Sequence, residues 1–270
     1  PPSDSPRPGG WLHPLTASVF AALCLAGAVP PTFAQEAPGG EDGEVWERVG
    51  GGLFVLGTLA MLDEPVRDLA DGLEGGALDD AAAFGRWYGD WPSTAPFLAG
   101  GLLLTGLVAD GGEGARRAGA AIAGVLSGSF ANEALNRAFG RSRPGEDRGA
   151  WQFDPFGGHA SLGSGHAAYT FALAAAVDEI ADGWVSTPFY VAATVTGLSR
   201  IYHDRHWLSD VAVGAAIGSL VGRRATRLSA RALGVGRPES PGRSSRRPVA
   251  TGARLEPVAT GRFLGLRIVF

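Results

Sequence analysis

The sequence predicts an all-α protein: a bundle of about six helices, followed by a short C-terminal tail that resembles a β-hairpin. Six uncharged stretches of 12 to 18 residues lie between residues 46 and 225, and none shows the alternation typical of a strand. Stretches of this length favour buried helices that pack as a bundle. They cover residues 49–62, 92–109, 118–132, 164–177, 183–199 and 211–222.

The N-terminal region has the layout of a secretory signal. An apolar run over residues 15–29 is followed by Pro30, Pro31 and small residues up to Ala34. We therefore expect a signal peptide over residues 1–34 and an exposed acidic leader over residues 35–45, with an N-terminal membrane anchor as the alternative. The expected location is outside the cytoplasm, in the periplasm or cell envelope.

The rest of the chain divides into three parts. The helical domain is expected over residues 46–232. Residues 233–249 are rich in Pro, Ser and Arg and read as a linker. In residues 250–270, apolar residues alternate at Leu264, Leu266 and Ile268 after Thr260-Gly261, which predicts a short β-like segment.

Composition excludes several classes of protein. The formal net charge of −4 argues against a nucleic-acid partner. The single Cys excludes a disulfide framework and a cysteine zinc site. A mean hydropathy of +0.08 is low for six membrane spans. We therefore expect a bundle that is soluble or associated with a membrane surface, with an integral membrane bundle as the alternative. The oligomeric state stays open.

Three segments concentrate the residues that can carry chemistry, and the richest is residues 199–210. His206 and Asp210 are four residues apart, so they share a face if that stretch is helical. A carboxylate beside an imidazole fixes its tautomer and leaves the other nitrogen free as a nucleophile. Arg200 offers a planar guanidinium that suits phosphate.

The other two segments add an anion nest and a second cation. Ser164 and Gly165 open an uncharged stretch, where free backbone N–H groups and the helix dipole favour an anion. His166 follows in the expected first turn, where it can donate a proton to a leaving oxygen. Arg143, followed by Pro144, supplies a second guanidinium. Together these residues indicate metal-free phosphoryl transfer through a phosphohistidine.

These residues resemble the signature of the type 2 phosphatidic acid phosphatase and vanadium haloperoxidase superfamily, which reads K-x6-RP, PSGH and SR-x5-H-x3-D. Ser199, Arg200, His206 and Asp210 match the third part in full. Ser164, Gly165 and His166 match the second part, and Arg143 and Pro144 match the first. The resemblance covers roughly residues 46–225, including the number of helices.

The resemblance implies a role for each matched residue. His206 would be the nucleophile, Asp210 would orient it, and His166 would be the acid for the leaving group. Arg143, Arg200 and the backbone of Ser164 and Gly165 would hold phosphate. No metal or other cofactor is implied, although vanadate can occupy such a pocket as a phosphate mimic.

Two positions depart from the family pattern. Asn136 stands where the family has its phosphate-binding Lys, and Gly163 stands where it has Pro. We hypothesise that Arg137 or Arg141 partly replaces the missing charge. The glycine is expected to loosen the turn before the anion nest.

The function that follows is hydrolysis of a phosphate monoester or a lipid phosphate by a metal-independent phosphatase. The substrate can be a phosphorylated small molecule or a lipid phosphate, and membrane association fits the second. Two alternatives remain open: a vanadate-dependent haloperoxidase-like oxidoreductase, and a weakened or non-catalytic anion-binding protein of the envelope.

Overall fold

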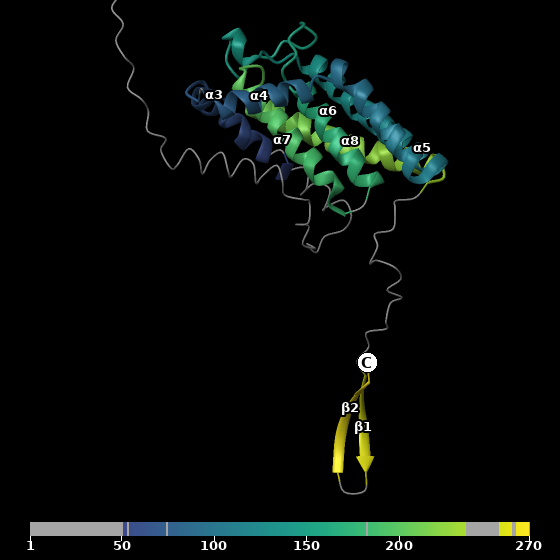
Figure 1. Cartoon of the computed structure of the whole chain (residues 1–270). Helices are drawn as coiled ribbons and strands as arrows, with labels where there is room; N and C mark the ends of the chain where they lie inside the picture. The colour runs from purple at the N-terminus through teal and green to yellow at the C-terminus, as the bar shows by residue number, and fades with distance from the viewer. Residues whose placement is uncertain are drawn as a thin grey trace, which may run out of the picture. The chain divides into compact units, whose positions relative to one another are not determined.

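The structure is a computed structural model that describes residues 51–235, apart from residues 53, 74 and 182, together with the backbone of two C-terminal strands (Figure 1). Residues 54–61 are helical. The helices that follow are α3 (Asp63–Asp71), α4 (Ala77–Tyr88), α5 (Trp91–Phe139), α6 (Gly165–Ile180), α7 (Thr187–Tyr202) and α8 (Leu208–Ala232). Two 3-10 turns, η1 (Pro144–Glu146) and η2 (Gly183–Ser186), precede α6 and α7.

The predicted all-α bundle is confirmed, but the six stretches do not map one to one onto helices. The stretches over residues 92–109 and 118–132 both belong to α5, and α3 and α4 were not predicted. Both missed helices are amphipathic: α4 carries Asp79, Asp80 and Arg86. A search for uncharged stretches finds helices that are apolar all round and passes over helices with a charged face.

Helix α5 is bent back on itself. Asp110 and Gly111 have non-helical backbone angles, and Gly111 has a φ of 55°. A Cβ added to Gly114 would lie 2.0 Å from the carbonyl oxygen of Gly106, eight residues earlier, so the two halves touch through their glycine backbones. An unbroken helix would separate these residues by about 12 Å. The two halves therefore run as an antiparallel pair.

Helix α6 forms the centre of the bundle. Most of its residues are buried, and Tyr169, Leu173 and Val177 form a core cluster with Ala121 and Val125 of α5. Glycines allow α8 to pack very closely against it: a Cβ on Gly218 would lie 2.2 Å from the carbonyl oxygen of Ala168. Gly214 and Gly222 make similar approaches one turn away on either side.

Strands β1 (Arg254–Thr260) and β2 (Phe263–Val269) pair in antiparallel fashion, with Thr260 opposite Phe263. The chain separates into one compact unit up to Arg237 and a second from Pro238 onward. The predicted signal peptide, the acidic leader and most of the linker lie outside the described residues.

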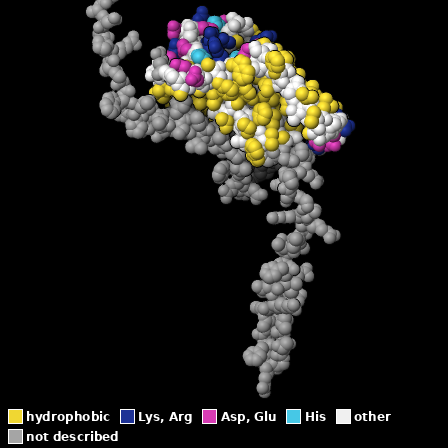
Figure 2. Space-filling model, viewed as in Figure 1, with side chains coloured by type: hydrophobic (Ala, Val, Ile, Leu, Met, Phe, Trp, Pro, Cys, Tyr) yellow, Lys and Arg dark blue, Asp and Glu magenta, His cyan; other side chains and the backbone are white. Residues whose placement is uncertain are grey.

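Large apolar side chains are exposed on the helical unit, where they cover much of the face seen in Figure 2. Phe97 is 82% exposed, Val108 80% and Phe130 77%, all on α5, and Leu220 of α8 is 71% exposed. In the part of the chain that the structure describes, α5 is the one helix long and apolar enough to cross a membrane. Charged side chains gather at the two ends of this face.

Candidate active site

The three motif segments meet at one end of the bundle. Hydrogen bonds join each pair of segments, among them Ser161 N–H to the Arg141 carbonyl at 3.1 Å, Trp207 Nε1–H to the Ser142 carbonyl at 2.9 Å, and Ser164 N–H to the Asp210 carbonyl at 2.9 Å. Segments far apart in the sequence thus lie side by side, as phosphoryl transfer in a shared pocket requires.

The imidazole of His206 is fixed by a backbone carbonyl. Nδ1 lies 3.0 Å from the carbonyl oxygen of Ser161. A carbonyl can only accept, so the proton is on Nδ1 and the lone pair is on Nε2. The residue is 5% exposed. Burial lowers the pKa of His206 to about 3, and the guanidiniums of Arg143 and Arg200 act in the same direction.

Asp210 acts on His206 less directly than the sequence suggested. His206 precedes α8 and is not part of it, and its Nδ1 lies 3.9 Å from Asp210 Oδ2. That oxygen instead accepts hydrogen bonds from Ser161 Oγ at 2.5 Å and from the Trp207 backbone N–H at 3.0 Å. Asp210 therefore anchors the two residues that hold and precede the histidine. Burial raises the pKa of Asp210 to about 6, against the opposing effect of Arg141.

Arg141 and Asp63 complete a buried charge network behind Asp210. Arg141 donates from Nη1 to Asp210 Oδ1 and from Nη2 to Asp63 Oδ2, both at 2.7 Å. Asp63 also accepts hydrogen bonds from the backbone N–H and the hydroxyl of Ser209. Arg141 is 2% exposed and Asp63 1%. Nothing in the sequence indicated this contact.

The hypothesis that Arg137 or Arg141 replaces the missing Lys is wrong. Both terminal nitrogens of Arg141 donate to carboxylates, those of Asp210 and Asp63. Arg137 pairs with Glu133 at 2.7 Å, and its side chain is 73% exposed. Neither residue lines the hollow that His166 and Arg200 share.

The two departures from the family pattern are in contact with each other. Asn136 Nδ2 lies 3.4 Å from the Gly163 carbonyl oxygen, and Asn132 Nδ2 lies 2.8 Å from the same atom. Gly163 has a φ of 84°, which the proline ring cannot adopt. A Cβ at this position would lie 2.4 Å from Asn132 Oδ1. The loop before α6 therefore has a conformation that the family's proline could not adopt, and the amides of Asn132 and Asn136 hold it through the Gly163 carbonyl.

The cations and the second histidine surround the same space. Arg143 donates to the Ala160 carbonyl at 3.2 Å, and Arg200 is 8% exposed with no hydrogen-bond partner for its Nε among the described residues. Burial lowers the pKa of His166 to about 4; Arg200 and Arg143 add to this effect, and Asp90 opposes it. His166, His206 and both guanidiniums are therefore close enough to influence one another's charge.

The anion nest at the start of α6 differs in one detail from the expectation. The backbone N–H of Ser164 is engaged by the Asp210 carbonyl, so it is not free for phosphate. The Ser164 hydroxyl instead caps α6 by accepting from Ala167 N–H. Gly165 is the exposed first residue of α6, where a backbone N–H has no partner within the helix.

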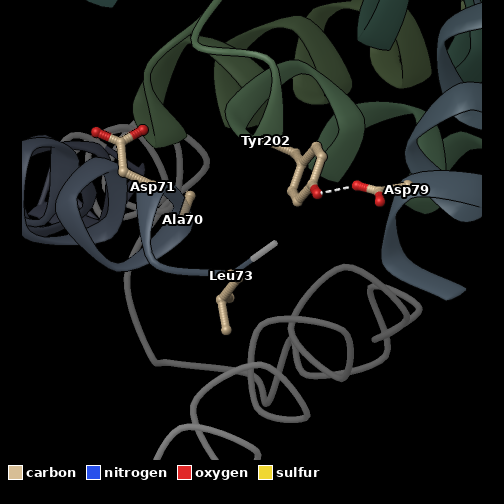
Figure 3. A pocket seen from close by; sticks show the side chains of 5 residues that line it. All are labelled: Ala70, Asp71, Leu73, Asp79 and Tyr202. Carbon is tan, nitrogen blue, oxygen red and sulfur yellow. Dashed lines mark hydrogen bonds between the residues drawn. The ribbon is translucent and has the colours of Figure 1, made fainter. Parts of the chain in front are cut away.

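A hollow of about 560 Å³ opens beside His166 and Arg200. Its lining includes His166, Arg200 and Asp90, with Arg86, His203 and Arg205 nearer the surface. A second hollow lies between the end of α3 and the start of α4 (Figure 3). There Tyr202 donates to Asp79, and Asp71 also lines the wall. The second hollow has carboxylates and no guanidinium in its lining, so it does not suit phosphate.

Residues 117–233, which contain all three motif segments, match the model of the PAP2 superfamily. This match confirms the resemblance to the PAP2 superfamily that the motifs predicted, over these residues.

Three curated relatives share one printed name, lipid A 1-phosphatase. The protein from Porphyromonas gingivalis is 47% identical over 66 residues, which is 23% of this chain and 15% of that protein. The proteins from Rhizobium etli and Rhizobium johnstonii are 38% and 37% identical, over 35% of this chain and 42% and 40% of their own lengths. The chain thus matches less than half of each relative.

Among solved structures, the crystal structure of Aquifex aeolicus LpxE aligns at a TM-score of 0.49 with 19% sequence identity. The alignment covers 62% of this chain and 95% of that chain.

Proposed function

We propose that this protein is a metal-independent phosphatase that hydrolyses a lipid phosphate monoester through a phosphohistidine on His206. The observation that carries the proposal is the hydrogen bond from His206 Nδ1 to the Ser161 carbonyl, because it leaves the Nε2 lone pair free. The low pKa of the ring keeps this lone pair available at neutral pH.

In the first step, Nε2 of His206 attacks phosphorus and the bond from phosphorus to the leaving oxygen breaks. His206 becomes positively charged, and Asp210 at 3.9 Å compensates that charge. Arg143 and Arg200 hold the phosphoryl oxygens.

His166 supplies the proton that the leaving oxygen needs. It is neutral in the empty pocket, because burial and the two guanidiniums lower its pKa. A bound phosphate cancels the guanidinium charges and so raises the pKa of His166, which then carries a proton to the leaving oxygen. In the second step, neutral His166 takes a proton from water, the water oxygen attacks phosphorus, and inorganic phosphate leaves His206.

The residues that carry this reaction are all present although Asn136 replaces the family's Lys. The family's Lys would add one cation, but Arg143, Arg200, His166 and His206 are all present and close together. This argues against the non-catalytic alternative, and no observation favours the haloperoxidase alternative.

A lipid phosphate is the substrate class that fits best. The relatives are by name phosphatases of a lipid. The exposed apolar side chains of α5 and α8 suit contact with a bilayer that would present such a substrate. The proposed location is a membrane of the cell envelope, with the pocket outside the cytoplasm as the predicted signal peptide implies.

The purified protein should release phosphate from an aryl phosphate and from phosphatidic acid, in the presence of a chelator. His206→Ala should abolish turnover, and His159→Ala, a histidine paired with Glu146 in the loop before Ser161, should retain it. Rapid quenching should trap an acid-labile phosphoprotein in the wild type only. Loss of all activity in chelator, or full activity of His206→Ala, refutes the mechanism.

A further inference from the structure

The pocket holds more positive charge than one phosphate requires. Three guanidiniums line it, with Arg200 inside and Arg86 and Arg205 at the mouth, and Arg143 is close enough to act on Arg200. Arg86 belongs to α4 and Arg205 to the turn after α7, and both are exposed. We call Arg86 and Arg205 the outer arginine pair. The proposed reaction gives them no role.

The outer arginine pair is not neutralised by the protein. In the region covering residues 51–235 that the structure describes, neither side chain forms an ion pair, whereas Arg67, Arg117 and Arg227 all do. Asp90 is the one carboxylate in the described lining of the pocket. Three guanidiniums of the lining therefore face one carboxylate, an excess of positive charge that attracts anions.

The arginines also act on one another. Burial lowers the pKa of Arg200 to about 10, and Arg205, Arg143 and Arg86 push it further in the same direction. Repulsion of this kind costs stability in the empty pocket, and a bound anion relieves it. His203, at the same mouth, has a buried Nε2 without a hydrogen-bond partner among the described residues.

The size of the pocket agrees with a ligand larger than one phosphate. Its volume of about 560 Å³ lies within the range of pockets that enclose whole small molecules. The inner residues, His166 and Arg200, and the outer arginine pair line the same hollow, so one ligand can contact both.

We propose that the outer arginine pair, with His203, forms a second anion subsite that binds a second phosphate group on the substrate. This inference rests on the proposed function and narrows it to substrates with two phosphates. The second phosphate can be joined directly to the first, as in a diphosphate, or carried elsewhere on the head group. Both sources present the same chemistry to a guanidinium.

Matched substrate pairs distinguish the two sources. Farnesyl diphosphate is compared with farnesyl monophosphate, and glucose 1,6-bisphosphate with glucose 1-phosphate. In Arg86→Gln and Arg205→Gln, kcat/KM for the doubly phosphorylated member of one pair should fall about tenfold, mostly because KM rises. For the monophosphate of that pair, kcat/KM should change less than about twofold. Arg116→Gln, an exposed arginine of α5, is the control and should change neither.

The pair that responds identifies where the second phosphate lies. The inference is overturned when both members of each pair lose activity equally, or when neither variant has any effect.

Binding to the inactive His206→Ala protein separates this inference from the proposed function. Calorimetry should show tighter binding of pyrophosphate than of inorganic phosphate. Adding Arg86→Gln or Arg205→Gln should lower the ratio of the two affinities about tenfold. Equal affinity for the two anions refutes the subsite whether or not the wild type turns over. A wild type without turnover that keeps the pyrophosphate preference refutes the proposed function alone.

Discussion

At the scale of single residues, the site is organised around His206 by groups that do not touch the substrate position. The Ser161 carbonyl fixes the ring, Asp210 fixes Ser161, and Arg141 fixes Asp210. Asp63 ends the series from a helix 78 residues away in sequence. A buried charge network of this kind stays ionised only because every member has partners, so removing one member leaves an unpaired charge.

The pH dependence follows from the lowered pKa of His206. A lowered pKa means that the ring stays neutral, and nucleophilic, until the pH falls to about 3. An unperturbed histidine would already be half protonated near pH 6.5. We therefore expect the His206 ring to stay neutral below pH 5, measured by NMR of its imidazole from pH 3.5 to about 8, because kcat/KM would also report Asp210, whose pKa is raised to about 6.

Recovery of full activity after return to neutral pH serves as the control for unfolding in acid. A titration of the His206 imidazole centred near pH 6.5 would show that His206 is not held as a buried neutral base.

Motif residues were easier to predict than their contacts. His206, His166, Arg143 and Arg200 stand out in the sequence because their types and spacing suit phosphate. The Ser161 carbonyl does not, because a backbone acceptor leaves no trace in the residue type. The pairing of Asn136 with Gly163 was equally hidden, since it depends on a positive φ and on two amides from the facing helix.

At the scale of elements, glycine placement determines how closely the helices approach. Gly214, Gly218 and Gly222 lie on one face of α8 and contact the start and middle of α6. Gly124 of α5 faces α8 in the same way, with Thr226 Oγ1 2.0 Å from the position of an added Cβ. The segment before α8 carries His206, and the first turn of α6 carries His166. The spacing of these helices therefore sets the spacing of the two histidines.

Gly218→Val should destabilise the bundle. The added Cβ would meet the Ala168 carbonyl, so α6 and α8 must separate, at a cost of about 1–3 kcal/mol typical of overpacked cores. Thermal unfolding followed by circular dichroism measures the loss. Gly119→Val is a matched control in α5, because nothing lies within 4 Å of its added Cβ. Equal melting temperatures for Gly218→Val and the wild type would contradict this account of the packing.

Helix prediction succeeded where a stretch was apolar all round and failed where packing decided the outcome. The uncharged stretches that became α6, α7 and α8 are surrounded by other helices or apolar surface. The bend in α5 was not predicted, because residues 110–117 read as a charged linker between two helices and are mostly helical in the structure. A pair of residues, Asp110 and Gly111, is enough to reverse the chain.

At the scale of the whole molecule, the helical unit combines charged side chains at the ends of the face seen in Figure 2 with apolar side chains exposed along its helices. Exposed apolar surface on this scale is uncommon in proteins that are surrounded only by water. Low mean hydropathy had favoured a soluble or surface-associated bundle, since it averages over charged terminal segments. The arrangement of exposed residues carries information that the average loses.

The protein should float with liposomes in a density gradient and resist a wash in 1 M salt, because apolar contact is insensitive to screening. Replacing Phe97, Leu104 and Val108 by Ser should weaken this retention, since all three are exposed apolar residues of α5. Trp151→Ser, which changes an exposed aromatic in the loop after η1, is the control. Release by salt alone would instead indicate attraction through the arginines.

The reversal in α5 also has a practical consequence. Asp90, just before this helix, and Arg143, just after it, both act on the pKa of His166. The chain therefore leaves the candidate active site along one half of α5 and returns to it along the other. The turn at Gly111 stands about 40 Å away, given 28 residues in the returning half. A reporter peptide grafted between Gly111 and Gly112, where an added Cβ meets nothing within 4 Å, would label the protein in living cells and leave its chemistry untouched.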